Sequence, residues 1–291
     1  MSNIKKSRQK EKIMYIVLVL ALLLRYAIQL ITFAQIPRLT SRAKNGLIIY
    51  RTSKSRHTNL KVYNNCYRKW MDLNPSATMI WFDDLDCKRY MRKQPRDVYE
   101  SYQRLRPGAF KADLFRLCLL YERGGVYVDC EAMPYVSLRE MMSGIELPRD
   151  RMFIAPLDRR GIHNGFMIAS PRHPFLASCI QYIVDNVKNE NYYDDDLAIT
   201  GPVALSRSIN RFLGRDDESP FHTGLNKFCD TSLYLYQYRN FLPQGPFQYI
   251  YRDNKCLVAK KHCVYSYLRA KLKPSAYFRM VKARQVYLPS N

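Results

Sequence analysis

Short apolar runs alternate with helix-like segments along the middle of the chain. Strand-like runs are expected at 46–50, 78–82, 126–128, 152–155 and 165–169. Helices are expected at 60–71, 85–91 and 175–187, and between Pro107 and the pair Gly124-Gly125. This order of strand, helix, strand, helix and strand predicts an α/β domain with a mainly parallel sheet and helices on its faces.

The start of the chain has a different pattern. Five basic residues, Lys5, Lys6, Arg8, Lys10 and Lys12, precede an apolar run at 13–33, which is long enough to span a bilayer core. Fewer basic residues follow closely, so the positive-inside rule predicts a type II single-pass membrane protein with its body in a Golgi- or ER-like lumen. The predicted parts are a basic cytoplasmic tail at 1–12, a transmembrane anchor at 13–34 and a stem at 35–45. The alternative is an apolar helix that lies on a membrane surface or packs on the domain.

The charge of the chain is strongly positive. Its 47 Lys and Arg against 25 Asp and Glu give a net charge of +22, which favours polyanionic partners such as an anionic membrane, phosphorylated ligands or nucleic acid. No nucleic-acid-binding signature accompanies it, so no nucleic-acid partner is expected. The 8 cysteines form no CxxC pair, which disfavours a zinc knuckle and leaves any disulfide pairing open.

Two acids follow the strand-like run at 126–128. Asp129 and Glu131 are two positions apart, and in an extended chain their side chains point to the same side. Carboxylate oxygens suit Mg²⁺ or Mn²⁺, and ligands of α/β sheets gather at the carboxyl ends of strands. The pattern therefore indicates a cation site for a phosphorylated ligand. The alternative is a turn with two solvated acids.

A second pair of charges lies on the preceding helix. Asp113 and Arg116 are three positions apart, so they share one helical face. The alternative is a surface ion pair that contributes less than about 1 kcal/mol.

The stretch ADLFRLCLLYERGGVYVDCE at 112–131 resembles the core signature of glycosyltransferase family 32, whose members carry a DXD motif. That family includes yeast initiation mannosyltransferases and capsular polysaccharide enzymes. Upstream, Trp70, Asn74, Pro75, Trp81, Asp83 and Asp84 are similar to a second block of the family. Downstream, HNGFMIASPRHPFL, TGPVAL and the segment 262–267 are similar to later blocks. The resemblance covers about 46–267, and it divides the body into a catalytic domain at 46–268 and a basic tail at 269–291.

The resemblance implies a GT-A-type, Rossmann-like fold, a nucleotide-sugar donor (a GDP- or UDP-sugar) and a Mn²⁺ or Mg²⁺ cofactor. It also implies retention of anomeric configuration, a glycan or lipid acceptor, and a hexose, with mannose favoured. Its implied catalytic residues are Asp129, Glu131, Asp113 and Arg116. Two departures leave a degenerate member possible: Glu131 replaces the usual Asp, and Tyr267 replaces a terminal Trp.

Individual roles follow from the same resemblance. Asp129 would contact the donor and belong to the metal shell, Glu131 would bind the cation directly, and His262 would complete the shell. Asp113, Arg116 and Asn164 would bind the donor, and Ser266 would contact its diphosphate.

Two other functions compete with this interpretation. A catalytically degenerate protein of the same fold could bind an anionic membrane or another polyanion, consistent with the net charge of +22. A metal-dependent phosphohydrolase could use the same acids, although no second metal cluster or nucleophile has suitable spacing. Asp194, Asp195 and Asp196 are expected to form a solvated loop, so attack from the leaving-group face is preferred to a protein nucleophile. Trp81 is expected in the sheet core.

Overall fold

The computed structural model describes residues 47–55, 60–240, 247–261 and 284–289, all in the unit Ala43–Asn291. The predicted cytoplasmic tail, membrane anchor and stem at 1–45 lie outside the described residues, as do His262, Ser266 and much of the predicted basic tail. Among the residues that are described, no helix combines the length and the apolar character needed to cross a membrane.

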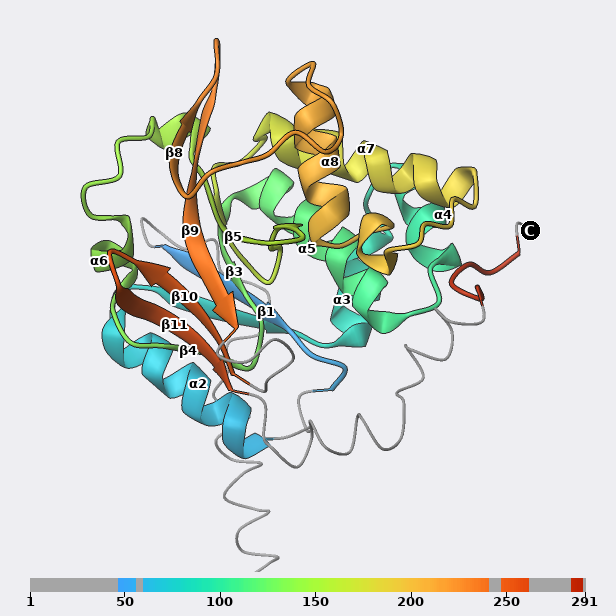
Figure 1. Cartoon of the computed structure of the whole chain (residues 1–291). Helices are drawn as coiled ribbons and strands as arrows, with labels where there is room; N and C mark the ends of the chain where they lie inside the picture. Colours follow the sequence, from blue (N-terminus) through green and yellow to red (C-terminus); the bar gives the residue numbers. More distant parts are fainter. Residues whose placement is uncertain (1–46, 56–59, 241–246, 262–283, 290–291) are drawn as a thin grey trace, which may run out of the picture. The chain divides into compact units, whose positions relative to one another are not determined.

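The described strands form one mixed sheet in the order β2-β1-β3-β7-β5-β9-β10-β11-β4, with β6 paired to β5 and β8 to β9 (Figure 1). The strands of its first half are β1 (Ile48–Thr52), β2 (Thr78–Phe82), β3 (Gly125–Val128), β5 (Phe153–Asp158), β6 (Gly161–Ile162) and β7 (Phe166–Ala169). The remaining strands are β4 (Ala132–Pro134), β8 (Gly224–Lys227), β9 (Ser232–Asn240), β10 (Phe247–Arg252) and β11 (Lys255–Lys261).

The α/β class is confirmed, but the prediction of a mainly parallel sheet is wrong. Parallel pairing among the described strands is confined to β1 with β2, β1 with β3 and β5 with β9. The link from β5 to β7 holds only the short strand β6, and a crossover between parallel strands needs a dozen or more residues. Strands β10 and β11 are joined at Asp253-Asn254, both with positive φ, as in a tight hairpin. These short links therefore impose the antiparallel pairs of β5 with β6 and β7 and of β10 with β11.

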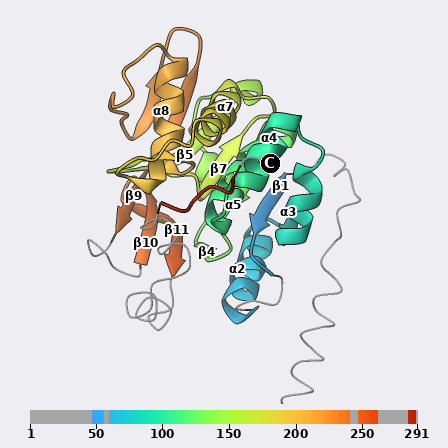
Figure 2. The same cartoon turned by 90° about the vertical axis from the view of Figure 1, so that its right-hand side faces the viewer.

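Helices cover both faces of the sheet. They are α2 (Leu60–Leu73), α3 (Asp84–Met91), α4 (Arg96–Arg104), α5 (Gly108–Arg123), α6 (Leu138–Met142), α7 (Pro174–Lys188) and α8 (Pro202–Phe212), with 3-10 turns at Arg149–Arg151 and Asp196–Ala198. Figures 1 and 2 show α3, α4, α5, α7 and α8 on one side of the sheet and α2 on the other. A hydrophobic core lies on each face of the sheet, one under α3, α4, α5, α7 and α8 and the other under α2. Neighbouring residues of β1 alternate between them: Tyr50 packs in the former and Ile49 in the latter.

The turn between α5 and β3 needs both of its glycines. Gly124 ends the helix with a φ of 63°, and a Cβ there would lie 2.6 Å from Cδ of Pro171. Gly125 has a φ of 104°, and its Cβ would lie 2.8 Å from the carbonyl oxygen of Ile48. The predicted helix from Pro107 to the glycine pair is confirmed, and the pair leads α5 directly into the central strand that ends at the two acids.

Candidate active site

The two acids lie in a tight turn between β3 and β4. The backbone amide of Ala132 donates to the carbonyl oxygen of Asp129 at 3.0 Å, so the segment 129–132 folds back on itself. The expectation of an extended chain at this point is therefore wrong, because the segment must leave β3 for β4, which pairs with β11. Asp129 and Glu131 nevertheless line one cavity, and both remain partly exposed.

Strand β1 anchors this acid turn (Asp129–Ala132) through the buried residue between the acids. Arg51 donates from Nη2 to the carbonyl oxygen of Cys130 at 2.5 Å and from Nε to its Sγ at 3.3 Å. The thiol of Cys130 in turn donates to the carbonyl oxygen of Thr52 at 2.7 Å. Burial raises the pKa of this thiol, which keeps it protonated as a donor. The turn is thus held at its centre, between the two acids, by contacts to β1.

Sequence analysis missed Arg51, which is 1% exposed. It carries no motif signal, since a single arginine at the end of a strand is usually solvated. Its guanidinium carbon lies 4.6 Å from the ring centroid of Trp81, a favourable cation–π contact. The expectation that Trp81 belongs to the sheet core is confirmed, because the ring is 1% exposed and its Nε1 donates to Ser53.

Arg116 connects helix α5 to the acid turn. Its Nη2 lies 3.4 Å from Oδ1 of Asp113, and its Nη1 lies 3.4 Å from Oδ1 of Asp129. Nη1 also donates to the carbonyl oxygen of Asn164 at 3.0 Å. The side chains of Asp113 and Arg116 are 12% and 8% exposed, so the alternative of a surface ion pair is wrong. The structure thus brings together four of the predicted site residues: Asp113, Arg116, Asp129 and Asn164.

Asp113 is held on both of its oxygens. The amide of Asn164 donates to Oδ1 at 3.0 Å, and the hydroxyl of Thr200 donates to Oδ2 at 2.8 Å. Burial raises the pKa of Asp113 to about 6, against the opposing effects of Arg116 and the two hydrogen bonds. Thr200 was not singled out as a site residue, although it begins the TGPVAL block.

Close packing around Asp129 requires a glycine at position 165, directly before β7. The amide of Asp129 donates to the carbonyl oxygen of Gly165 at 2.9 Å, which continues the pairing of β3 with β7. A Cβ at Gly165 would lie 2.6 Å from Oδ2 of Asp129 and 2.6 Å from Cε1 of His163. Gly165 therefore leaves the room that the carboxylate occupies.

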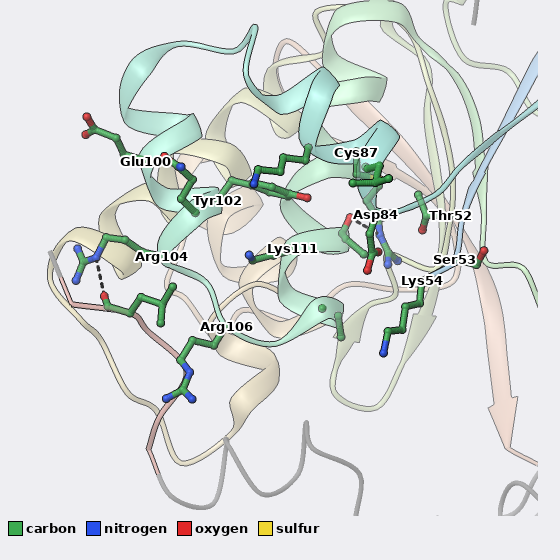
Figure 3. Close-up of a pocket in the computed structure, with 18 of the residues that line it drawn as sticks. Thr52, Ser53, Lys54, Asp84, Cys87, Glu100, Tyr102, Arg104, Arg106 and Lys111 are labelled. Atoms are coloured by element: carbon green, nitrogen blue, oxygen red, sulfur yellow. Dashed lines mark hydrogen bonds between the residues drawn. The ribbon is translucent and has the colours of Figure 1, made fainter. Parts of the chain in front are cut away.

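Two cavities meet at Arg116 and Asp129. The larger, of about 1430 Å³, lies beyond the ends of β1 and β2, and Glu131 lines it as well. Figure 3 shows Lys54, Asp84 and Lys111 around this larger cavity. The smaller, of about 580 Å³, lies on the side of Asp113, Asn164 and the N-terminus of α8.

The acid turn fits part of a divalent-cation shell. Both acids offer hard carboxylate oxygens to the same cavity, and Asp129 is 22% exposed, so a cation could reach it. Within the described ranges, however, no three residues among His, Cys, Asp and Glu form a group that could hold a metal. Further ligands would have to come from a phosphorylated substrate or from residues outside those ranges, where His262 and Ser266 lie.

Comparison with known proteins supports the family resemblance seen in the sequence. A family model described as the glycosyltransferase sugar-binding region containing the DXD motif matches residues 61–147. The chain is 25% identical over 202 residues to the initiation-specific alpha-1,6-mannosyltransferase of Candida albicans, covering 64% of this chain and 50% of that protein. It is 28% identical over 147 residues to a mannosyl phosphorylinositol ceramide synthase of Saccharomyces cerevisiae, covering 48% of this chain and 36% of that protein.

Among solved structures, the glycosyltransferase PaToxG is similar with a TM-score of 0.45 and 13% identity, covering 58% of this chain and 69% of that one. The resemblance to the DXD-containing glycosyltransferases is confirmed. The predicted enzyme class, glycosyltransferase, is also the class given by the description of the matched family and by the names of the relatives. The family match contains Asp113, Arg116, Asp129 and Glu131, whereas Asn164, His262 and Ser266 lie beyond it. The chain spans half or less of the length of these two curated relatives.

Proposed function

We propose that the chain is a metal-dependent, retaining glycosyltransferase of the GT-A type that transfers a hexose from a nucleotide sugar to a glycan or lipid acceptor. The observation that carries the proposal is the buried network of Asp113, Arg116 and Asp129 at the junction of two cavities. The larger cavity has room for a nucleotide sugar, and we call it the nucleotide-side cavity; the smaller has room for an acceptor group, and we call it the acceptor-side cavity. Mannose from a GDP-sugar is the first donor to test, because both named yeast relatives are mannosyl-transferring enzymes by name.

The nucleotide-side cavity has the charge that a diphosphate needs. Lys54, Lys88, Arg106 and Lys111 line it, and Figure 3 shows Lys54 after β1 and Arg106 and Lys111 around the start of α5. Burial lowers the pKa of Lys111, with nearby Lys88 acting in the same direction, and the negative charge of a bound phosphate would oppose this lowering. The donor's nucleotide would therefore lie beyond the ends of β1 and β2, with its diphosphate directed toward the acid turn.

Asp129 and Glu131 are the proposed cation ligands, with Mn²⁺ or Mg²⁺ as the cofactor. A bound cation would supply electrostatic stabilisation of the charge that develops on the departing diphosphate. His262 is the proposed third protein ligand, and Ser266 a contact to the diphosphate. In support, Lys260 pairs with Ala132 of the acid turn, and β11 ends at Lys261, the residue before His262. Strand β11 thus ends beside the acid turn.

The residues of the buried network would orient the donor. Arg116 is fixed by three contacts and would face the sugar and the adjoining phosphate, while Asp113 and Asn164 would bind sugar hydroxyls. The two carboxylates lining the acceptor-side cavity besides Asp129 are already hydrogen-bonded, Asp113 to Asn164 and Thr200, and Asp158 to the amides of Arg160 and Gly161. Neither is placed as a free nucleophile, which favours attack from the leaving-group face.

The membrane arrangement is a proposal from the sequence. It comprises the cytoplasmic tail at 1–12, the type II anchor at 13–34, the stem at 35–45, a lumenal catalytic domain at 46–268 in the Golgi or ER, and the basic tail at 269–291. The apolar run and the flanking charges support it.

The test is turnover of GDP- and UDP-sugars by the full chain in detergent, with Mn²⁺ and with or without a glycan acceptor. Asp129→Ala and Glu131→Ala should each lose most activity, as should the wild type in excess EDTA. Glu131→Asp should retain activity because it restores the acid usual in the family. Glu146→Ala, which changes an exposed acid outside both cavities, is the matched control.

The outcomes separate the competing functions. Full activity in either alanine variant would contradict the site. Hydrolysis of the nucleotide sugar that continues unchanged when a glycan acceptor is added would favour a phosphohydrolase. Salt-sensitive binding to anionic liposomes without any turnover would favour the degenerate, polyanion-binding protein, which the net charge of +22 allows.

A further inference from the structure

We propose that the acceptor carries a phosphate group, which Arg159, Arg160 and Arg239 bind at the mouth of the acceptor-side cavity. The inference rests on the proposed function, because it names the substrate class of the same site. All three arginines line this cavity, and none of them lines the nucleotide-side cavity. The strands β5 and β9 run parallel, with Leu157 opposite Gln237; Arg159 and Arg160 lie in the turn after β5, and Arg239 lies in β9 two residues after Gln237.

The three guanidinium groups are exposed and available. Within the ranges that the structure describes, none of them takes part in an ion pair, although Arg239 lies 5.3 Å from the ring centroid of Tyr251. Asp158 is the nearest acid in sequence, but its Oδ1 accepts from the amides of Arg160 and Gly161, at 2.6 and 3.1 Å. That acid is used to close the hairpin turn. The mouth of the cavity therefore has an excess of positive charge.

The hairpin that carries Arg159 and Arg160 is fixed in place. Gly161 has a φ of 140°, and a Cβ there would lie 2.6 Å from Oγ of Ser206 and 2.9 Å from the carbonyl oxygen of Pro202. The same Ser206 hydroxyl accepts from the amide of Ile162 at 2.7 Å. Helix α8 thus clamps the hairpin tip, so the arginines are presented from a rigid support.

The helix adds to the positive potential. Gly201 caps α8 without a side-chain hydrogen bond, and both Gly201 and Pro202 line the cavity. The first amides of a helix carry a partial positive charge and favour anions. The helix end and the three arginines therefore act on the same space.

The interior of the cavity has the opposite character. Asp113 and Asp129 line it as well, and they are less exposed than the three arginines, so their charge would repel a phosphate from the deeper part. His163 and Tyr238 form a stacked pair, with ring centroids 4.5 Å apart, and both line the cavity. This polarity orients the acceptor: its neutral polyol or sugar ring would enter toward Asp129, and its phosphate would stay at the arginines.

The transfer step balances in this orientation. A hydroxyl oxygen of the acceptor would bond to the anomeric carbon of the donor as the bond from that carbon to the phosphate oxygen breaks. The nucleoside diphosphate would leave with the electron pair, and the hydroxyl proton would pass to its departing oxygen. The acceptor phosphate takes no part in the bond changes and only holds the acceptor.

The experiment compares phosphorylated with neutral acceptors: mannose 6-phosphate with mannose, and glycerophosphoinositol with inositol. The full chain in detergent is used, as wild type, as Arg159→Gln/Arg160→Gln and as Arg239→Gln. Arg149→Gln/Arg151→Gln removes the same charge as the double variant from exposed positions outside both cavities and is the matched control. Each substitution of an arginine should raise the KM of a phosphorylated acceptor about tenfold or more, because it removes a charge-assisted contact to the phosphate.

The control should leave that KM unchanged, and hydrolysis of the donor without acceptor should be equal in all variants. A preference for mannose 6-phosphate would identify a free sugar phosphate, and one for glycerophosphoinositol a lipid headgroup. Equal KM values for phosphorylated and neutral acceptors in the wild type would overturn the inference. A raised donor KM in the arginine variants would also overturn it, because the arginines would then belong to the donor site.

A readout without turnover separates this inference from the proposed function. Mannose 6-phosphate should raise the Tm of the wild type and of the control, but not of the arginine variants. That result in a chain without transferase activity would contradict the proposed function and still support the phosphate site. Transfer without such a difference in Tm or KM would support the proposed function and contradict the phosphate site.

Discussion

Nη1 of Arg116 lies 3.4 Å from Oδ1 of Asp129, so a side chain of helix α5 holds the acid that follows strand β3. The contact is possible because the two glycines after α5 turn the chain directly into β3. It is also enclosed, since the guanidinium lies 4.5 Å from the ring centroid of Tyr127. The position of Asp129 between the two cavities therefore depends on α5 as much as on its own turn.

Gly165→Ala should impair the acid turn without a general loss of folding. The new Cβ would lie 2.6 Å from Oδ2 of Asp129, so the carboxylate must move away. We expect a raised Mn²⁺ requirement for activity and a fall in kcat of about tenfold or more, since small displacements of catalytic groups are costly. Gly108→Ala is the steric control: it adds the same methyl group at the wall of the nucleotide-side cavity, but nothing lies within 4 Å of the new Cβ. Superimposable Mn²⁺ titrations of the two variants would contradict this role of Gly165.

Arg116→Lys should lower both activity and stability. A lysine retains the charge but cannot reach Asp113, Asp129 and the carbonyl oxygen of Asn164 together. Leaving buried partners unsatisfied should reduce the free energy of unfolding by about 1–3 kcal/mol, measured by urea denaturation. Arg211→Lys is the matched control: it disrupts a forked pair with Asp217 at an exposed position, where the cost should stay below about 1 kcal/mol. Equal losses of unfolding free energy in the two variants would show that Arg116 contributes no more than an exposed ion pair.

The sequence was sufficient for the part of the fold that builds the acid turn. Apolar runs and glycine punctuation located β1, β2, β3 and α5, because these elements are buried or end at residues with special backbone angles. Helices α4 and α8 and the strands β8–β11 were not predicted. The strand Gly224–Lys227, for example, has no buried residue, and a short polar strand of this kind gives little apolar signal.

The candidate site was predicted only as far as its motifs extend. Asp113, Arg116 and Asp129 share a recognisable stretch, so their proximity could be anticipated. Arg51 and Thr200 are as deeply buried, but each reaches the site through tertiary packing from a distant segment. A polar residue of this kind cannot be told from a solvated one by spacing alone. The extended geometry expected for Asp129 and Glu131 failed for the same reason, because the pairing of β4 with β11 turns the chain.

Asp113 should make stability dependent on pH. Burial raises its pKa to about 6, against about 3.9 for an ordinary Asp. The folded state therefore binds the proton more tightly, and the contribution of Asp113 to stability is complete below pH about 4 and falls as pH rises through about 6. The two pKa values correspond to about 3 kcal/mol. We expect the free energy of unfolding of the wild type, relative to Asp113→Asn, to fall by about that amount between pH 4 and 7 in buffer with EDTA. A difference independent of pH would show that Asp113 titrates normally.

Tyr127→Phe should loosen Asp129 while it preserves the packing of Arg116. The hydroxyl of Tyr127 lies 2.8 Å from Oγ1 of Thr52 and donates to Oδ1 of Asp129 at 3.4 Å. Phenylalanine keeps the ring beneath the guanidinium but removes the link between β1 and the carboxylate. We expect a loss of about 1 kcal/mol in the free energy of unfolding, together with a higher Mn²⁺ concentration for half-maximal activity.

Tyr236→Phe separates these two effects. Tyr236 is also buried, and its hydroxyl donates to the carbonyl oxygen of Met141 at 2.8 Å, away from both cavities. Its loss should cost similar stability, because one buried hydrogen bond is removed in each variant. It should leave the Mn²⁺ titration unchanged, since no contact to Asp129 is involved. If both variants lower stability and neither changes the Mn²⁺ dependence, Tyr127 supports the sheet alone, and Arg116 and Gly165 suffice to position Asp129.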